Sequence, residues 1–161
     1  MKRANQSEPR EKPAEPRQKP VVCLEEVAFL ELCRAQDLLS RRLSVLLKTE
    51  DLSATQYNVL RILRGAPEGL PCGEVGNRMI TRDPDITRLL DRLEKRGLIV
   101  RSRDLQDRRM VMARITPEGL KLLARMDEPV RAGHRNQLGH LGRERLRTLI
   151  DLLQVARQEQ G

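Results

Sequence analysis

The sequence predicts a mainly helical fold with one small β-hairpin, an α+β arrangement in a single domain. Apolar residues recur at helical spacing over most of the chain, and two short β-type runs lie close together after its midpoint. The 161 residues include one Phe, one Tyr and no Trp, so the core must be built from Leu, Ile, Val, Met and Ala. Aliphatic residues of this kind suit packed helices.

The first twenty residues are not expected to fold. They contain four prolines among charged and amide residues, and almost no apolar side chains. Such a composition cannot offset the conformational entropy that folding costs. We therefore expect a disordered, basic, Pro-rich arm at 1–20 and a single folded domain at 21–161.

Three helices are expected next. Apolar residues with charges between them indicate one long helix from Cys23 to about Lys48. Ser53 is a favoured N-cap residue and Gly65 is a stop signal, so a second helix is predicted at about 54–64. A short third helix follows at about 71–79.

A fourth, strongly amphipathic helix is predicted at 83–96. Asp83 can cap it, Pro84 suits its first position, and Gly97 ends it. Its apolar positions follow the i, i+3, i+4, i+7 pattern of one buried face, made of Ile86, Leu89, Leu90 and Leu93.

A hairpin and two more helices complete the expected fold. Residues 98–103 and 110–115 have β character, and the polar loop between them lacks the Gly of a two-residue turn. Thr116, Pro117 and Glu118 are typical of a helix start, so a fifth helix begins there, with Pro129 inside it. A sixth is predicted near the C-terminus from its apolar positions, Leu146, Leu149, Ile150 and Leu153.

The positive charge is concentrated in one part of the chain. Of the formal net charge of +8, the arm carries +3, and residues 78–114 carry +5 from eleven basic and six acidic residues. A field confined in this way is typical of a phosphate-binding surface, although a solvated basic face is the alternative. Single-strand binders stack bases on aromatic rings, which are scarce here, so double-stranded DNA is favoured.

Two short helices, an amphipathic helix and a two-stranded ribbon follow one another in the order of a winged helix-turn-helix. Residues 80–98, ITRDPDITRLLDRLEKRGL, together with Asp107-Arg108-Arg109 and Thr116-Pro117-Glu118-Gly119, resemble the MarR family of bacterial transcriptional regulators. The resemblance spans about residues 24–155. It implies a winged helix-turn-helix core at about 53–116 and a homodimer formed by the helices at about 23–48 and 117–158.

The resemblance also implies which residues contact DNA. Those on or just before the recognition helix at 83–96 are Arg82, Thr87, Arg88 and Arg92, and those on the β-wing are Arg108 and Arg109. Asp107 is expected to support the wing by orienting an arginine through a charged hydrogen bond. Arginine can pair with guanine O6 and N7, and threonine can touch a thymine methyl group. The alternative for the helix arginines is surface pairing with neighbouring acids, namely Asp85, Asp91 or Glu94.

These features together predict a sequence-specific repressor that binds a pseudo-palindromic operator as a homodimer, with half-sites about one helical turn apart. The resemblance further implies relief of repression by a small aromatic or phenolic effector. Two alternatives stay open. One is a redox-sensing regulator of the same fold that uses Cys23. The other is a winged-helix adaptor that binds protein, which would not need so many basic residues.

The sequence predicts neither an enzyme nor a cofactor or metal site. His134 and His140 are six residues apart, with no Cys or acid that completes a ligand pattern, and no Gly-rich phosphate loop occurs. Three cysteines without CxxC spacing favour neither disulfides nor zinc. No apolar stretch approaches the roughly 18 residues of a membrane span, and no secretion signal is seen. We expect a cytoplasmic protein with no membrane partner.

Overall fold

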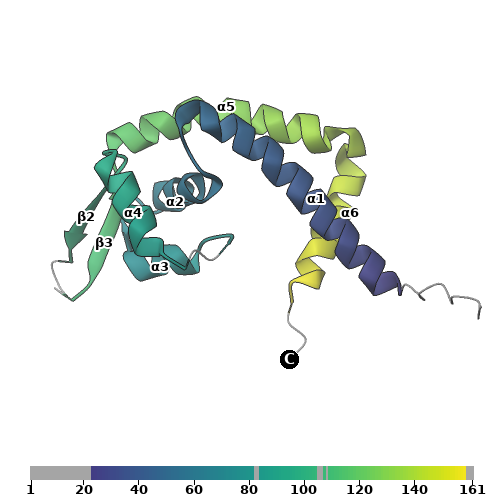
Figure 1. The fold of residues 1–161 in the computed structure, drawn as a ribbon, viewed down its shortest axis with the longest axis horizontal. Helices are drawn as coiled ribbons and strands as arrows, with labels where there is room; N and C mark the ends of the chain where they lie inside the picture. The colour runs from purple at the N-terminus through teal and green to yellow at the C-terminus, as the bar shows by residue number, and fades with distance from the viewer. Residues whose placement is uncertain (1–22, 82–83, 105–106, 108, 159–161) are drawn as a thin grey trace, which may run out of the picture. The chain divides into compact units, whose positions relative to one another are not determined.

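The computed structural model describes residues 23–81, 84–104, 107 and 109–158 (Figure 1). The predicted arm, Arg82, Asp83 and Arg108 lie outside these residues. The chain divides into two units, 1–34 and 35–161, and each is considered by itself. In the first unit the described residues form the beginning of the first helix. Apart from Cys23 and Cys33, the residues of the sites discussed below belong to the second unit.

Six α-helices confirm the predicted number and order of helices in the described chain. They are α1 (Leu24–Leu47), α2 (Ala54–Arg64), α3 (Cys72–Asn77), α4 (Ile86–Lys95), α5 (Pro117–Leu138) and α6 (Gly142–Ala156). Two short 3-10 turns, η1 (Lys48–Glu50) and η2 (Gly139–Leu141), follow α1 and α5. The predicted caps are present. The Ser53 hydroxyl accepts the Gln56 N–H at 3.1 Å, and the Thr116 hydroxyl accepts the Gly119 N–H at 3.1 Å.

The prediction that α4 begins at residue 83 was wrong. Asp85 is its cap, because Oδ1 of Asp85 accepts the Arg88 N–H at 3.1 Å, and the helix begins at Ile86. Two aspartates on either side of Pro84 both had cap chemistry, and the later one reaches the free N–H group of the first turn. The end of α4 agrees with the prediction, since Gly97 follows it with a φ of 67°.

A small antiparallel sheet with strand order β1-β3-β2 joins these helices. The predicted hairpin is β2 (Ile99–Arg103) and β3 (Val111–Ile115), in which Arg101 lies opposite Ala113. The third strand, β1 (Leu70–Pro71), was not predicted, because two residues carry no periodic signal. β1 pairs Leu70 with Ala113 and so places the loop after α2 beside the hairpin.

The core is aliphatic apart from Tyr57, and no charged residue or other polar residue is buried among the described ones. In Figure 1, α2 lies between α5 and α3, and all three helices contribute to one hydrophobic cluster. The apolar face of α4 is buried as predicted, with Leu89, Leu90 and Leu93 inside and Ile86 packed at the edge. None of the described helices has the length and apolarity that a membrane span requires.

The start of α5 is held unusually close to the end of α4. The Thr116 hydroxyl donates to the Gly97 carbonyl at 2.6 Å, and the Thr116 N–H donates to the Leu98 carbonyl at 3.1 Å. A Cβ at Gly119 would lie 2.3 Å from the Leu98 carbonyl oxygen, so only glycine allows this approach.

Candidate nucleic-acid interface

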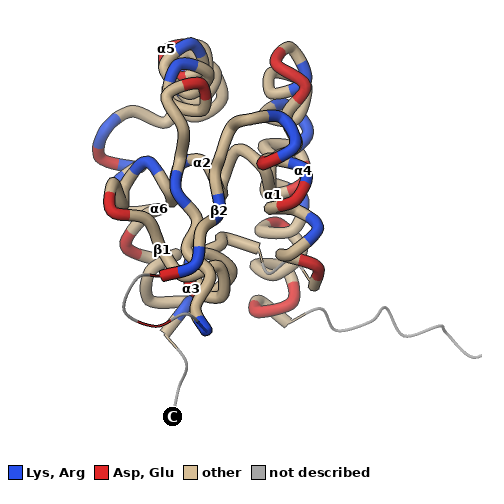
Figure 2. Tube along the Cα trace, turned by 90° about the vertical axis from the view of Figure 1, so that its left-hand side faces the viewer, with Lys and Arg blue, Asp and Glu red and all other residues tan. Residues whose placement is uncertain are grey.

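The outer face of α4 carries the residues that sequence reasoning assigned to DNA. Thr87, Arg88 and Arg92 are exposed, whereas the opposite face is buried in the core. Basic residues recur along α4 and on the adjoining strands of the sheet (Figure 2). The N-terminal end of α4 therefore presents one hydroxyl and one guanidinium to solvent on adjacent residues.

Arg88 is paired in this structure with its own helix cap. Its Nε lies 3.0 Å from Oδ2 of Asp85, and the Arg88 side chain is still 77% exposed. This is one of the surface pairs that sequence reasoning left as the alternative to a DNA contact. Exposed ion pairs at this spacing contribute little to the free energy of folding. Arg88 can therefore leave Asp85 for another acceptor at a small cost in free energy.

The other two acids of α4 are bound by an arginine that sequence reasoning missed. Arg101 on β2 donates from its Nη2 to both Asp91 and Glu94, the latter at 2.7 Å, and from its Nε to Glu94 at 2.9 Å. The Arg101 main-chain N–H also donates to Glu94 at 2.8 Å. The Arg101 side chain is mostly buried, and its hydrogen bonds hold the pKa of the Glu94 carboxyl below the ordinary value. Asp91 and Glu94 therefore pair with the wing rather than with Arg88 or Arg92.

Arg92 lies in different surroundings from Arg88, although both are on the outer face of α4. It lines a surface depression of about 510 Å³ together with Lys48, Lys95 and Arg96. Among the described residues no ion pair of Arg92 is found. Asp51 also lines this depression, so its charged lining consists of four cationic residues and one carboxylate.

The turn of the wing is closed by main-chain and aspartate hydrogen bonds. The Asp104 N–H donates to the Met110 carbonyl at 3.0 Å, and the Met110 N–H donates to the Asp107 carbonyl at 2.9 Å. Oδ1 of Asp107 accepts the main-chain N–H of Arg109 at 2.9 Å. Asp107 thus contacts the main chain of an arginine, in a turn that leaves the Arg109 side chain exposed.

A second contact that the sequence did not reveal holds the turn before α4. Oδ1 of Asn58 on α2 accepts the Ile80 N–H at 2.9 Å. This bond ties the segment between α3 and α4 to the helix behind it. Neither Asn58 nor Arg101 stands in a local pattern with its partner, so no spacing rule for a single helix or strand could find it.

The cysteines differ in their surroundings. Cys23, the candidate redox residue, is exposed before α1, and its sulfur accepts the Glu26 N–H at 3.4 Å. Cys33 is exposed on α1, and burial raises the pKa of the Cys72 thiol, which makes its reactive thiolate scarcer. In the part of the chain that is described, no three His, Cys, Asp or Glu side chains are grouped as metal ligands would be.

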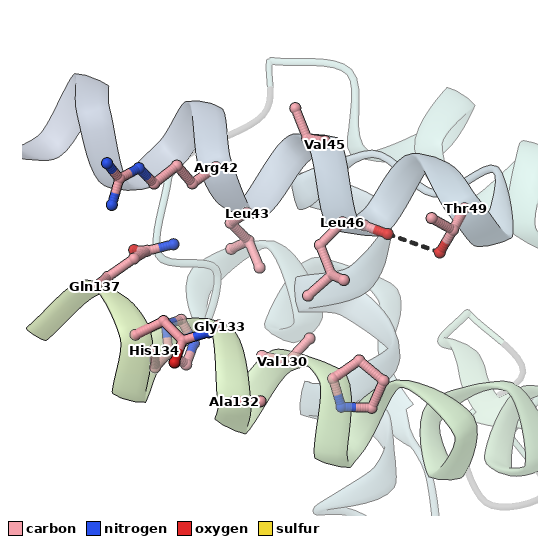
Figure 3. Close-up of a pocket in the computed structure, with 12 residues that line it drawn as sticks. Arg42, Leu43, Val45, Leu46, Thr49, Val130, Ala132, Gly133, His134 and Gln137 are labelled. Carbon is pink, nitrogen blue, oxygen red and sulfur yellow. Dashed lines mark hydrogen bonds between the residues drawn. The ribbon is translucent and has the colours of Figure 1, made fainter. Parts of the chain in front are cut away.

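A cavity of about 470 Å³ lies between the last turns of α1 and the second half of α5 (Figure 3). Leu43 and Leu46 point from α1 toward Val130 on α5, and Arg42 and Gln137 lie at one end. The cavity is therefore apolar along its length and carries a cationic group at its rim, a combination found in sites for small organic ligands.

Comparisons with known proteins agree with this geometry. Residues 52–111 match the family model described as "MarR family". The HTH-type transcriptional regulator FarR of Neisseria gonorrhoeae is 32% identical over 123 residues, which cover 76% of this chain and 83% of FarR. A MarR transcription factor from Planctomyces limnophilus, whose crystal structure is known, is 41% identical with a TM-score of 0.65, covering 83% of this chain and 98% of that one. The PcaV regulator from Streptomyces coelicolor, solved with its natural ligand, is 28% identical with a TM-score of 0.71, covering 86% and 96%.

Replacing Arg101 by methionine is expected to lower the free energy of unfolding at pH 7 by about 1–2 kcal/mol, after allowance for partial exposure. The change leaves Asp91 and Glu94 unpaired beside each other. Since the folded-state pKa of Glu94 lies below its ordinary value of 4.5, the bond contributes fully above that pH and is lost as the pH falls through the lowered value. Urea unfolding at pH 7 and below pH 4.5 measures the difference, which should shrink in acid.

The matched control is Arg103→Met, which removes the same charge from an exposed position on the same strand. Equal stability of the two variants at pH 7 would contradict the structural role assigned to Arg101.

Proposed function

Because the chain belongs to the MarR family of transcriptional regulators, we propose that it is a repressor that binds a pseudo-palindromic operator in double-stranded DNA as a homodimer. The observation that carries this proposal is the outer face of α4, whose neighbouring acids Asp91 and Glu94 are engaged by Arg101. What remains on that face is basic and exposed, as a helix that enters a major groove requires.

Each DNA contact has its own proposed role. Arg88 leaves Asp85 and pairs with guanine O6 and N7, while Thr87 contacts a thymine methyl group. Arg92 adds charge toward the phosphates. Arg109 on the wing enters the minor groove, where narrow width and negative potential favour arginine. Arg82 and Arg108, outside the described residues, keep the DNA contacts that the family resemblance implies.

The homodimer is supported by an apolar face of α6. Ile150 is 52% exposed and Leu153 is 37% exposed, and with Leu146 and Leu149 they recur at helical spacing. Apolar stripes of this kind are usually covered by a partner. In the proposed dimer α6 and the other terminal helices form the interface, and a dimer bound at a promoter represses transcription by occupying it.

Selection from a randomised duplex DNA pool at near-physiological salt tests the proposal. The wild-type protein should enrich a two-fold symmetric site. Arg88→Ala should relax the preference at one base pair in each half-site, at a cost of about 1–3 kcal/mol. Arg109→Ala should weaken binding to all sites and reduce the slope of log affinity against log salt by about 0.9 for each phosphate that the variant no longer neutralises.

Arg143→Ala is the control, because it removes one exposed positive charge from the start of α6, at the other end of α5 from the wing. Unchanged base preference in Arg88→Ala would overturn the role of Arg88. Absence of any salt-sensitive duplex binding by the wild type would favour the protein-binding adaptor instead.

The double substitution Ile150→Asp with Leu153→Asp is expected to give a monomer at micromolar concentration, since two carboxylates would have to be buried in the proposed interface. Light scattering after size-exclusion chromatography measures the mass. Arg147→Asp, which adds a carboxylate to the polar side of the same helix beside Glu144 and Asp151, should remain dimeric. A dimeric double variant would exclude this face of α6 from the interface.

The cavity between α1 and α5 is the proposed site of an effector, a small aromatic acid whose carboxylate faces Arg42. PcaV, a similar protein, is known with a bound ligand, which supports such a role. Millimolar 4-hydroxybenzoate should release the wild-type protein from its operator. A Cβ at Gly133 would meet only Leu46, at 3.7 Å, so Gly133→Leu should fill the cavity and abolish release. Gly139→Leu, at an open position, is the control. Equal release from all three proteins, or none from wild type, contradicts this site.

A further inference from the structure

The turn between α1 and α2 is bonded to two other helices at once. Arg96, at the C-terminal end of α4, donates to the main-chain carbonyls of Glu50 and Asp51, the first at 3.1 Å. The Glu50 carboxylate accepts from Nε of Arg125 on α5 at 3.0 Å and from Nη2 of Arg125 at 2.8 Å. Glu50 therefore bonds to α4 through its main-chain carbonyl and to α5 through its side-chain carboxylate.

Local backbone geometry prepares this turn for both partners. The Leu52 N–H donates to the Leu47 carbonyl and the Asp51 N–H to the Lys48 carbonyl, both at 3.1 Å, and Asp51 has a φ of 52°. This is a Schellman motif, in which a left-handed residue ends the helix. It leaves the carbonyls of Glu50 and Asp51 without helical partners, and a guanidinium is a favourable donor at the negative end of a helix.

The bond to α5 is a charged, two-pronged one. Both nitrogens of the Arg125 fork reach the two oxygens of Glu50, and these bonds lower the pKa of the Glu50 carboxyl. The carboxylate is therefore ionised at neutral pH. A bidentate arginine–carboxylate pair fixes orientation as well as distance.

Elsewhere α4 and α5 share one neighbouring helix and meet at one point. Both pack on α2, and α4 packs in addition on α3 and β2. The start of α5 meets the residues that follow α4 at Thr116 and Gly119. The turn at 48–51 is a polar bridge between the recognition helix and a helix that the proposed function assigns to the dimer. It holds α4 at its C-terminal end, whereas Thr87 and Arg88 lie at its N-terminal end.

We infer that Glu50, Arg96 and Arg125 are positioning residues that set the direction of α4 relative to α5, and thereby the distance between operator half-sites that the dimer accepts. The inference rests on the proposed function. The ten residues of α4 span about 15 Å, so a rotation of about 6.5° about the Arg96 end moves the N-terminal end by about 1.7 Å. In a two-fold dimer both helices move, and the distance between them can change by about 3.4 Å, one base-pair step. A small rotation of α4 at the turn is therefore enough to change the preferred distance between half-sites by one base pair.

The test uses full-length protein and duplexes that carry the selected half-sites at centre-to-centre distances changed in steps of one base pair. The proteins compared are wild type, Glu50→Gln, Arg125→Gln, the double variant and Glu128→Gln. Glu128 is the control, because it pairs with Arg135 on the same helix and joins no second element. Affinity for each duplex and for an isolated half-site, with thermal unfolding of each protein, is measured.

The wild type should prefer one distance, and Glu50→Gln and Arg125→Gln should each reduce that preference by about threefold, with base preference inside the half-site unchanged. The two single changes alter net charge in opposite directions, so a shared effect on spacing cannot come from general attraction to DNA. The double variant should be no worse than either single variant, because both remove the same bond.

Wild-type spacing preference in Glu50→Gln or Arg125→Gln would overturn the inference and leave the proposed function intact. An equal loss in Glu128→Gln would also overturn it, since the effect would then be one of charge alone. If Glu50→Gln does not fold, Arg125→Gln carries the test, because the Arg125 side chain is 58% exposed. A wild type that binds two half-sites no better than one would overturn the proposed function, and this inference with it.

Discussion

The guanidinium of Arg101 holds the recognition helix and the wing together. It lies on β2, opposite Ala113, and binds Asp91 and Glu94 of α4 in a largely buried position. This interaction has two effects. It holds the hairpin against α4, and it neutralises two carboxylates close to the surface proposed to bind phosphates. Without it the charges of α4 would largely cancel one another along the helix.

The residues of α4 accordingly divide into three groups by their direction around the helix. Leu89, Leu90 and Leu93 face the core, the acids Asp91 and Glu94 face Arg101, and the remaining polar residues face solvent. Asp85, the cap residue before α4, has two roles. One carboxylate oxygen caps the helix, and the other pairs with the Arg88 side chain. The residue proposed to read a base is therefore paired, in the absence of DNA, with the group that starts its own helix.

Most of the fold could be predicted because its signals are local. Apolar spacing, Ser53, Gly97 and Thr116 located the helices, and two β-type runs located the hairpin. The start of α4 was misplaced because two aspartates offered the same cap, and β1 was missed because two residues have no period. The exposure of Thr87, Arg88 and Arg92 was predicted correctly. The bonds of Arg101 and Asn58 could not be predicted, since each joins elements that only the folded chain brings together.

The close approach at Gly119 brings the first turn of α5, the end of α4 and the start of β2 together at one point. No side chain fits between Gly119 and the Leu98 carbonyl, and Thr116 adds two hydrogen bonds at the same place. Such a joint is a pivot: it fixes the point where the two helices meet and leaves the angle between them to contacts farther away. A change along α5 therefore reaches α4 as a change of angle about this point.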